Sequence, residues 1–153
     1  MPGSFDEQFE RSFGAVAFIA NRHMMDHMRR LSVEMEMDFE SVYVWGLVAH
    51  LGAIKYFGTG RDSAQETPVN SVPQEALQGV RLSDLTAISG LPRETLRRKL
   101  EALQASKRLL RDDKGLWVLH PDGIEERTKE FTKETVRRLL NAARDIEQLL
   151  SRS

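Results

Sequence analysis

Basic side chains are concentrated between Arg93 and Arg111, and their spacing there is the feature of the sequence that could carry chemistry. This stretch holds seven basic residues against two acidic ones, a net charge of +5, whereas the whole chain of 153 residues has a formal net charge of −1. Double-stranded nucleic acid attracts counter-charge locally and releases its own counterions, so local concentration matters more than total charge. The pattern therefore indicates a nucleic-acid-binding surface.

A helix is needed to position these side chains, and the leucines predict it. Leu96, Leu100 and Leu103 repeat at steps of four and three, which gives one buried stripe. Because residues advance by about 100° along a helix, the opposite face is centred on Glu94 and Arg98. We therefore expect long polar side chains along the exposed side of this helix.

A shorter helix is expected just before it. Ser83 can cap its start, Leu85 and Ile88 share one face, and Gly90 supplies the left-handed residue that ends it. Pro92 suits the first turn of the second helix because its φ is already close to the helical value. The sequence thus predicts two helices joined by a tight turn over a leucine core.

A β-hairpin is expected after the second helix. Leu109–Arg111 and Leu116–Leu119 are short strand candidates joined by Asp112–Gly115, whose Asp and Gly residues tolerate turn dihedrals. Val80–Arg81 can add a third short strand. In a winged helix such a hairpin lies beside the recognition helix, which would place Lys114 at the phosphate backbone.

The stretch GLPRETLRRKLEALQASKRLLRDDKGLWVL resembles the DNA-binding winged helix of the cyclic-AMP receptor and fumarate–nitrate regulator superfamily. That family's pattern is a small or Gly residue, an apolar residue, Ser or Pro, then Arg-Glu-Thr and a following Arg. The resemblance implies base contacts for Arg93, Glu94 and Arg98 and a backbone contact for Thr95. No cyclic-nucleotide β-roll precedes the stretch, so the family's ligand does not carry over.

The order of elements is similar to that of the MarR-type repressors, which dimerise through their terminal helices. In this chain too, long helices are predicted before and after the winged region. The Asp-x-Arg wing motif of those repressors is absent, so this second resemblance concerns architecture only.

Both terminal segments read as long amphipathic helices, over residues 7–32 and 124–151. Roughly 25 residues at 1.5 Å each extend nearly 40 Å, more than a small winged domain can cover, so part of each stripe is expected to meet another chain. The alternative is that the methionines simply fill a core. The stripe residues are Phe9, Phe13, Val16, Ala17, Ile19, Ala20, Met24, Met28 and Leu31, then Val136, Leu139, Leu140, Ala143, Ile146, Leu149 and Leu150.

The middle of the chain predicts a largely apolar helix followed by a long loop. Asp38 can cap the helix, which is too short and too interrupted, by His50 and Lys55 among others, to span a bilayer. Residues 58–79 are polar and aperiodic, which favours a mobile insertion; a DNA-touching arm is the alternative. Arg61 is the only basic residue there.

Catalysis has little support in the sequence. There is no cysteine, no Gly-rich phosphate loop and no nucleophile elbow, so we expect no enzyme and no cofactor. His23 and His27, with Asp26 between them, could present ligands to Zn²⁺ and so serve a hydrolase or transferase, but no third protein ligand is obvious. We expect these histidines, and the lone His50 and His120, to bind no metal.

The predicted fold is mainly α, a winged helix-turn-helix with long N- and C-terminal helices forming a dimerisation region. We expect a single domain over residues 1–153. It would contain an N-terminal dimerisation helix at 1–36, a winged helix-turn-helix at 37–120 with a flexible loop at 58–79, and a C-terminal dimerisation helix at 121–153.

The predicted function is a homodimeric, sequence-specific transcriptional regulator of double-stranded DNA with a palindromic operator. The helix at about 92–106 would enter the major groove and the wing at 109–119 would contact the backbone. A small-molecule effector has room in such a fold, though the sequence names none. With no cysteine and no secretory signal we expect a cytoplasmic location and no membrane association. The expected DNA contacts are Arg93, Glu94, Thr95, Arg97, Arg98, Lys99, Lys107, Arg108 and Lys114.

The alternative is a winged-helix protein-interaction module that never binds DNA. Its acidic remainder, which carries a charge of −6 outside Arg93–Arg111, could meet a basic partner. The discriminating feature is the triplet Arg93, Glu94 and Arg98, because an interaction module has no need of long polar side chains on that face.

Overall fold

The computed structural model describes residues 3–57 and 74–152, and it is mainly helical with one small antiparallel sheet. The chain forms two compact units, Met1–Met37 with Glu126–Ser153 and, between them in sequence, Asp38–Glu125. A single domain was predicted from chain length. Two units form because the terminal helices pack on each other along most of their length.

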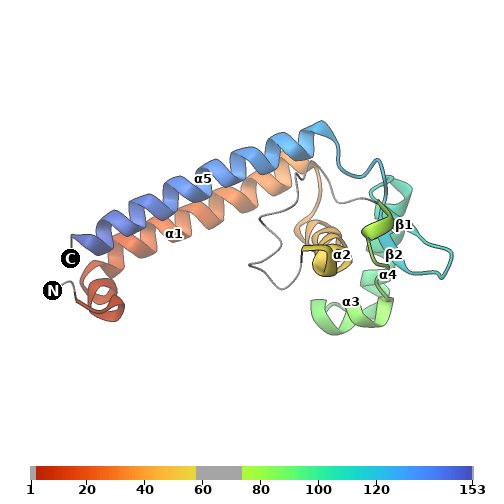
Figure 1. Ribbon diagram of the computed structural model, residues 1–153, viewed down its shortest axis with the longest axis horizontal. Coiled ribbons are helices and arrows are strands. Elements are labelled where there is room, and N and C mark those ends of the chain that lie inside the picture. The colour runs from red at the N-terminus through yellow and green to blue at the C-terminus, as the bar shows by residue number, and fades with distance from the viewer. Residues whose placement is uncertain (1–2, 58–73, 153) are drawn as a thin grey trace. The chain divides into compact units, whose positions relative to one another are not determined.

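The first unit is a pair of long helices, α1 (Phe5–Met35) and α5 (Glu126–Ser151), which lie side by side and antiparallel (Figure 1). Both helices confirm the predicted terminal helices, and α1 extends beyond the predicted bounds at both ends. Ser4 caps α1: its hydroxyl accepts a hydrogen bond from the Glu7 amide at 3.3 Å, and the Glu7 carboxylate accepts one from the Ser4 amide at 3.0 Å. Glu36 ends the helix in the left-handed region, with φ +53°.

The second unit contains α2 (Phe39–Phe57), a short 3₁₀ turn η2 (Gln74–Ala76), and the helices and strands that follow. Asp38 caps α2 as predicted, accepting a hydrogen bond from the Ser41 amide at 3.0 Å. Helix α2 packs against α3, α4 and β2. The buried apolar core of this unit is Val44, Trp45, Val48, Val80, Leu85, Leu96, Leu100, Leu103, Leu109, Trp117, Val118 and Leu119.

Helices α3 (Leu82–Ser89) and α4 (Arg93–Ala105) are joined by a three-residue turn. Gly90 ends α3 at φ +69°, and its amide donates to the carbonyl of Thr86. The predicted cap at Ser83 is wrong: α3 begins one residue before it, and the Arg81 carbonyl already accepts from the Leu85 amide. Pro92 is extended and directly precedes α4, so it lies just outside the helix whose first turn it was predicted to occupy.

Strands β1 (Leu109–Arg111) and β2 (Trp117–Leu119) form the predicted hairpin, in which Leu110 is opposite Val118. The Asp112 carboxylate holds the connecting turn, accepting from the amides of Lys114 and Leu116 at 2.9 Å each. The third strand predicted at Val80–Arg81 is reduced to an isolated bridge between Val80 and Trp117.

The long loop predicted at residues 58–79 is described only from residue 74 onward; residues 58–73 lie outside the described residues. The described part of this stretch contains the 3₁₀ turn η2. Within the part of the chain that the structure describes, no helix combines the length and the apolar character that crossing a bilayer requires.

Candidate nucleic-acid interface

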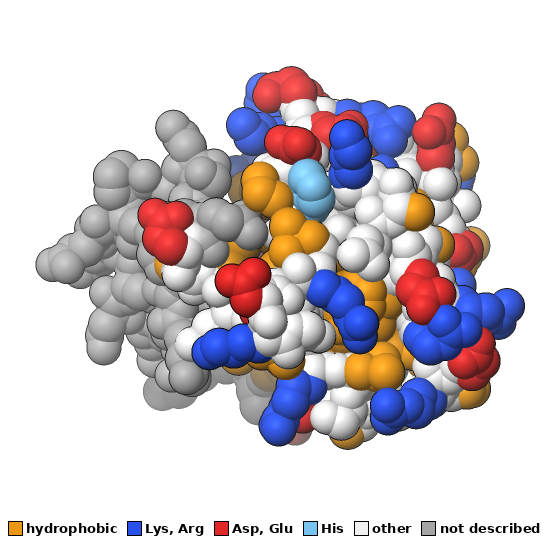
Figure 2. All heavy atoms as spheres, turned by 90° about the vertical axis from the view of Figure 1, so that its right-hand side faces the viewer, with side chains coloured by type: hydrophobic (Ala, Val, Ile, Leu, Met, Phe, Trp, Pro, Cys, Tyr) orange, Lys and Arg blue, Asp and Glu red, His pale blue; other side chains and the backbone are white. Residues whose placement is uncertain are grey.

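Helix α4 buries its leucine stripe and exposes the opposite side. Leu96, Leu100 and Leu103 are buried, whereas Arg93 and Arg98 are exposed. Figure 2 shows Lys and Arg side chains interspersed with Asp and Glu on the face it presents. The charged surface is therefore mixed in sign, and which arginines remain unpaired decides what it can bind.

Arg97 is paired with two carboxylates of its own helix. Its guanidinium lies 2.6 Å from the carboxylate of Glu94 and also pairs with Glu101. The hydrogen bond from Arg97 lowers the pKa of Glu94 below its usual value, so this carboxylate stays ionised. Arg97 and Glu94, both predicted to contact DNA, are thus brought together and partly neutralise each other.

Lys99 forms ion pairs within its own unit. Its ammonium group lies 2.7 Å from the carboxylate of Asp38 and 3.2 Å from that of Glu40, and its side chain is 19% exposed. The hydrogen bond from Lys99 is the largest cause that lowers the pKa of Asp38. Lys99 therefore connects α4 to the start of α2, and this contact competes with its predicted role at a phosphate.

Arg93 and Arg98 differ from these residues, since neither forms an ion pair with a carboxylate within the described residues; Arg98 acts on Glu94 only through a longer-range charge interaction. Both are exposed on α4, and Thr95, between them in sequence, is half-buried. Their guanidinium donors are available to an external acceptor.

The predicted contacts beyond α4 have three different settings. Lys107 is exposed and left-handed, with φ +56°, in the turn that follows the helix. Arg108 is half-buried, with its guanidinium 4.9 Å from the ring centre of Trp45, so its side chain packs on α2. Lys114 is exposed in the β1–β2 turn.

Arg111, at the end of β1, is a candidate that sequence reasoning left out. It is directly opposite Trp117 in the hairpin register, and its guanidinium lies 4.9 Å from the Trp117 ring centre. The signal was present in the sequence, because pairing the two predicted strands places these residues side by side. Arg111 lines a hollow of about 330 Å³ together with Leu82, Arg93, Arg97, Leu100, Glu101, Gln104 and Trp117.

The first unit has a second surface of interest, an apolar face on one side of the helix pair. A helix advances by about 100° per residue, which gives the direction of each side chain around the helix axis. The residues of α1 on this face point about 90° away from Val16 and Arg30, the side chains that face α5. The residues of α5 on this face point about 90° away from Phe131, in the same rotational sense. In an antiparallel pair, equal rotations point to the same side. We call this surface the two-helix apolar face: Phe13, Ala17, Ala20, Met24 and Met28 with Val136, Leu139 and Ala143.

The other side of the helix pair is polar. There the Asp26 carboxylate accepts a hydrogen bond from Arg138 at 2.6 Å, which holds the pKa of Asp26 below its usual value. A hollow of about 320 Å³ is lined by this pair and by Ile19, Arg22, His23, Asn141, Ala142 and Asp145. Exposed Phe18 and Met25 lie beside Arg22 and Asp26, so charged side chains distinguish this side of the unit from the two-helix apolar face, although it is not free of apolar ones.

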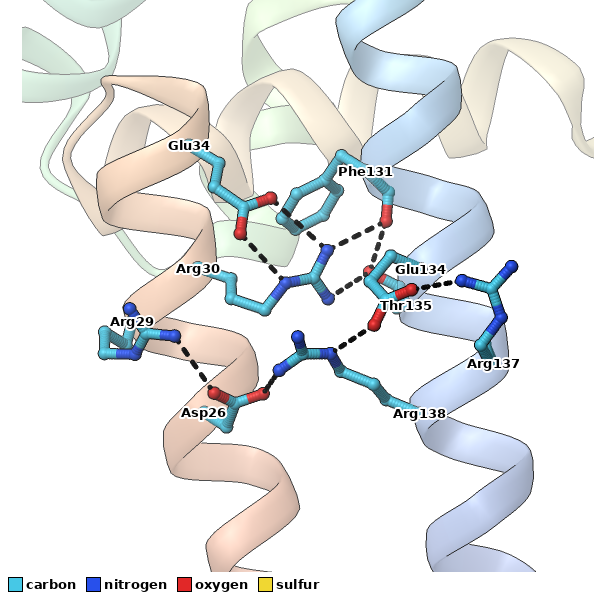
Figure 3. Close-up of polar contacts among 9 residues, drawn as sticks. All are labelled: Asp26, Arg29, Arg30, Glu34, Phe131, Glu134, Thr135, Arg137 and Arg138. Atoms are coloured by element: carbon cyan, nitrogen blue, oxygen red, sulfur yellow. Dashed lines mark hydrogen bonds and ion pairs between the residues drawn. The ribbon is translucent and has the colours of Figure 1, made fainter.

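A buried arginine fixes how the two helices meet (Figure 3). Arg30 is 1% exposed, and its guanidinium donates to the Glu34 carboxylate at 3.1 Å on its own helix. Across the seam it donates to the Thr135 hydroxyl at 3.1 Å and the Phe131 carbonyl at 3.2 Å. The burial of this charge is matched by hydrogen bonds that only one register of α1 on α5 provides.

The histidines considered as metal ligands lie along the same helix. The rings of His23 and His27 are 6.4 Å apart between centroids, and His27 also contacts the Phe131 ring. Desolvation by burial, and then the nearby Arg30 cation, lower the pKa of His27. Across residues 3–57 and 74–152, no three His, Asp or Glu side chains converge on a point where a metal ion could sit.

Comparison with known proteins gives no relative. No protein-family description, no curated protein and no solved structure matches the chain. The resemblances seen in the sequence therefore remain predictions, and functional inference rests on the side chains described above.

Proposed function

We propose that the protein is a sequence-specific transcriptional regulator that binds double-stranded DNA as a homodimer. In this proposal Asp38–Glu125 is a winged helix-turn-helix, with α4 as the recognition helix and β1–β2 as the wing. The observation that carries it is the pair of exposed arginines, Arg93 and Arg98, which have no carboxylate partner within the described residues although neighbouring Arg97 has two.

Free guanidinium groups on a helix fit the chemistry of the major groove. Each can donate two hydrogen bonds, either to the O6 and N7 acceptors of guanine or to a phosphate, and an ionised Glu94 can accept from the amino group of cytosine. The bond from Arg97 keeps Glu94 charged and restricts its rotamers. In this proposal the exposed Lys107 and Lys114 contact phosphate, whereas Lys99 stays paired with Asp38.

The homodimer rests on the two-helix apolar face. Five of its large side chains are about half exposed, namely Phe13, Met24, Met28, Val136 and Leu139. Together they expose roughly 450 Å² of apolar surface per chain, or about 900 Å² in a symmetric pair. The alanines of the face and a polar rim would add to this area, and a standard interface buries about 1,600 Å² in total. A second copy that packs its own helix pair on this face would form a four-helix bundle.

A second candidate function is a winged-helix module that binds protein. The mixture of acidic and basic side chains in Figure 2 favours it, because DNA-binding faces are usually more uniformly basic. The free arginines on α4 are the observation against it, since a protein-binding face gains little from unpaired guanidinium groups in solvent.

Selection of bound sequences from a random duplex pool tests the proposal. We expect an enriched palindrome whose half-sites are about 34 Å, or one DNA turn, apart. The Arg93→Ala/Arg98→Ala double variant should enrich nothing, while Arg144→Ala, an exposed change on α5, should enrich the same palindrome. No enrichment by the wild-type protein would favour the protein-binding module.

A further inference from the structure

The hollow between α4 and β1 has an excess of positive charge. Arg93, Arg97 and Arg111 line it against one carboxylate, that of Glu101. That carboxylate is already paired with Arg97. The charges of Arg93 and Arg111 are therefore uncompensated within the described residues, on two sides of a cavity of about 330 Å³.

Arg111 is held in place without being neutralised. Its guanidinium lies over the Trp117 ring, and Trp117 is itself 3% exposed and fixed by the Val80 bridge. Stacking on an aromatic ring orients a guanidinium but leaves its in-plane N–H donors available. A cation fixed in this way loses little side-chain entropy when it binds an anion.

The remaining lining residues suit an oxyanion. Gln104 brings a side-chain amide, which can donate, beside the apolar side chains of Leu82 and Leu100. A tetrahedral oxyanion accepts several hydrogen bonds at once, and guanidinium groups match it with paired donors.

We propose that this hollow, formed by Arg93, Arg97, Gln104 and Arg111, binds one phosphate oxyanion. It rests on the proposed function in one respect: if the protein binds DNA through α4, the oxyanion is a backbone phosphodiester beside the recognition helix. A free phosphate ion offers the same chemistry, and the experiment separates the two sources. Arg111 then positions the DNA through its backbone and contacts no base.

The experiment uses the full chain and the duplex selected above, with binding followed by fluorescence anisotropy over a salt series. Arg111→Gln should weaken binding to the selected and the scrambled duplex by the same factor, about three- to tenfold near 0.1 M salt, and should reduce the salt slope by about one. Arg111→Lys keeps the charge and should keep the slope. Arg144→Gln, an exposed arginine on α5, is the matched control and should change neither quantity.

Duplexes with a single neutral methylphosphonate identify the phosphate itself. Several positions should weaken the wild-type complex, and at one of them per half-site the same replacement should have no further effect in Arg111→Gln. If every penalty persists in Arg111→Gln, or if the salt slope is unchanged, the proposal is overturned. So would a variant that alters base preference, because a phosphate contact is indifferent to sequence.

Calorimetry with inorganic phosphate, at ionic strength matched with sodium chloride, provides the second arm. If the protein binds no duplex, the proposed function alone fails. Inorganic phosphate that binds the wild-type protein but not Arg111→Gln would then show an oxyanion site that serves a purpose other than DNA binding. If neither duplex nor inorganic phosphate binds, the oxyanion site is overturned as well. Unchanged thermal unfolding of Arg111→Gln and Arg111→Lys establishes that both variants fold.

Discussion

The guanidinium of Arg30 lies 4.5 Å from the centre of the Phe131 ring and also donates a hydrogen bond to the backbone carbonyl of Phe131. Phe131 of α5 thus contacts the same cation of α1 through both its ring and its backbone. The hydroxyl of Thr135, one turn further along, accepts a hydrogen bond from Arg30 and donates one to the Phe131 carbonyl at 2.9 Å. A slip of α1 along α5 would leave a buried charge without these acceptors, so this cluster sets the register of the helix pair.

Replacement of Arg30 by Ala should therefore destabilise the helix pair strongly. We expect a loss of about 2–4 kcal/mol in the free energy of unfolding, from the missing hydrogen bonds and the space left behind. Arg29→Ala is the control, because Arg29 is exposed and, among the described residues, pairs with Asp26 alone. Urea unfolding followed by circular dichroism, at one fixed protein concentration, measures both; equal losses would contradict the assigned role.

Mild acid should loosen the same seam through His27. Burial and the neighbouring Arg30 cation lower the pKa of His27. On the same helix His23 also opposes protonation of His27, whereas Asp26 favours it. The side chain of α5 that contacts His27 is the uncharged ring of Phe131. As pH falls through about 6.5, the unfolded chain takes up the proton before the folded one does, so stability is complete above that pH and declines below it.

The variant His27→Phe should remove this pH dependence. Its Nδ1 atom is buried without a hydrogen-bond partner among the described residues, so an apolar ring of similar size fits the site. Unfolding free energies at pH 7.5 and pH 5.5 provide the measurement. His50→Gln, a change of an exposed histidine on α2, serves as the control. A wild-type protein equally stable at both pH values would rule out the effect.

Lys99 and Asp38 should act as a stabilising pair. The Lys99→Ala and Asp38→Ala single variants are each expected to lower stability, and a double-mutant cycle should give a coupling of about 0.5–1 kcal/mol, a modest value because Asp38 is exposed. The lowered pKa of Asp38 means that this contribution is present above the ordinary Asp pKa of about 3.9 and is lost as pH falls below it.

The same substitution separates a structural from a DNA-binding lysine. If Lys99 connects α4 to α2, Lys99→Ala should leave the salt slope of DNA binding unchanged. A slope reduced by about one would instead restore its predicted contact with a phosphate.

Arg98 and Lys114 should differ in what they contribute to DNA binding. Arg98→Ala is expected to cost about 1–3 kcal/mol on the selected duplex and to relax preference at one base position per half-site. Lys114→Ala should weaken binding to all sequences alike and lower the salt slope by about one. Binding isotherms on a panel of single-base variants check this, and identical profiles for the two variants would refute the division into base-reading and backbone-contacting residues.

A charge on the two-helix apolar face should separate the proposed homodimer. Leu139→Glu places a carboxylate on this face, whereas Asn141→Glu places one on the polar side of the same helix. We expect light scattering to show a monomer for the first and a dimer for the second. The monomer should bind the palindrome far more weakly, since the second half-site no longer benefits from effective concentration. A wild-type monomer at tens of micromolar would exclude the dimer outright.

Local patterns in the sequence predicted the helices and strands well. Leu96 and Leu100 set the period of α4, and Gly90 and Pro92 set the turn before it, because these signals act through the backbone of a few adjacent residues. The missed cap at Ser83 shows the limit of such signals: a helix start shifted by one residue removes the capping geometry, and sequence assigns such ends least accurately.

Side-chain pairing was much harder to foresee. Lys99 and Arg98 are adjacent and both basic, yet Lys99 pairs with Asp38, 61 positions earlier in the chain, and Arg98 does not. A charged residue appears equally available in a sequence whether or not the fold brings a carboxylate to it. For the same reason the burial of Arg30 had no local signal, because its acceptors on α5 are about 100 residues away.

The antiparallel pairing of α1 with α5 also governs the order in which the protein can assemble during synthesis. The 88 residues of Asp38–Glu125 emerge from the ribosome between the two helices and have their own core, so that unit can fold first. At about 5–20 residues per second, α1 then waits roughly 5–25 s for its partner, with its apolar stripes exposed to other chains and to chaperones. A nascent chain that stalls before α5 should therefore be prone to aggregation, even though its central unit is already folded.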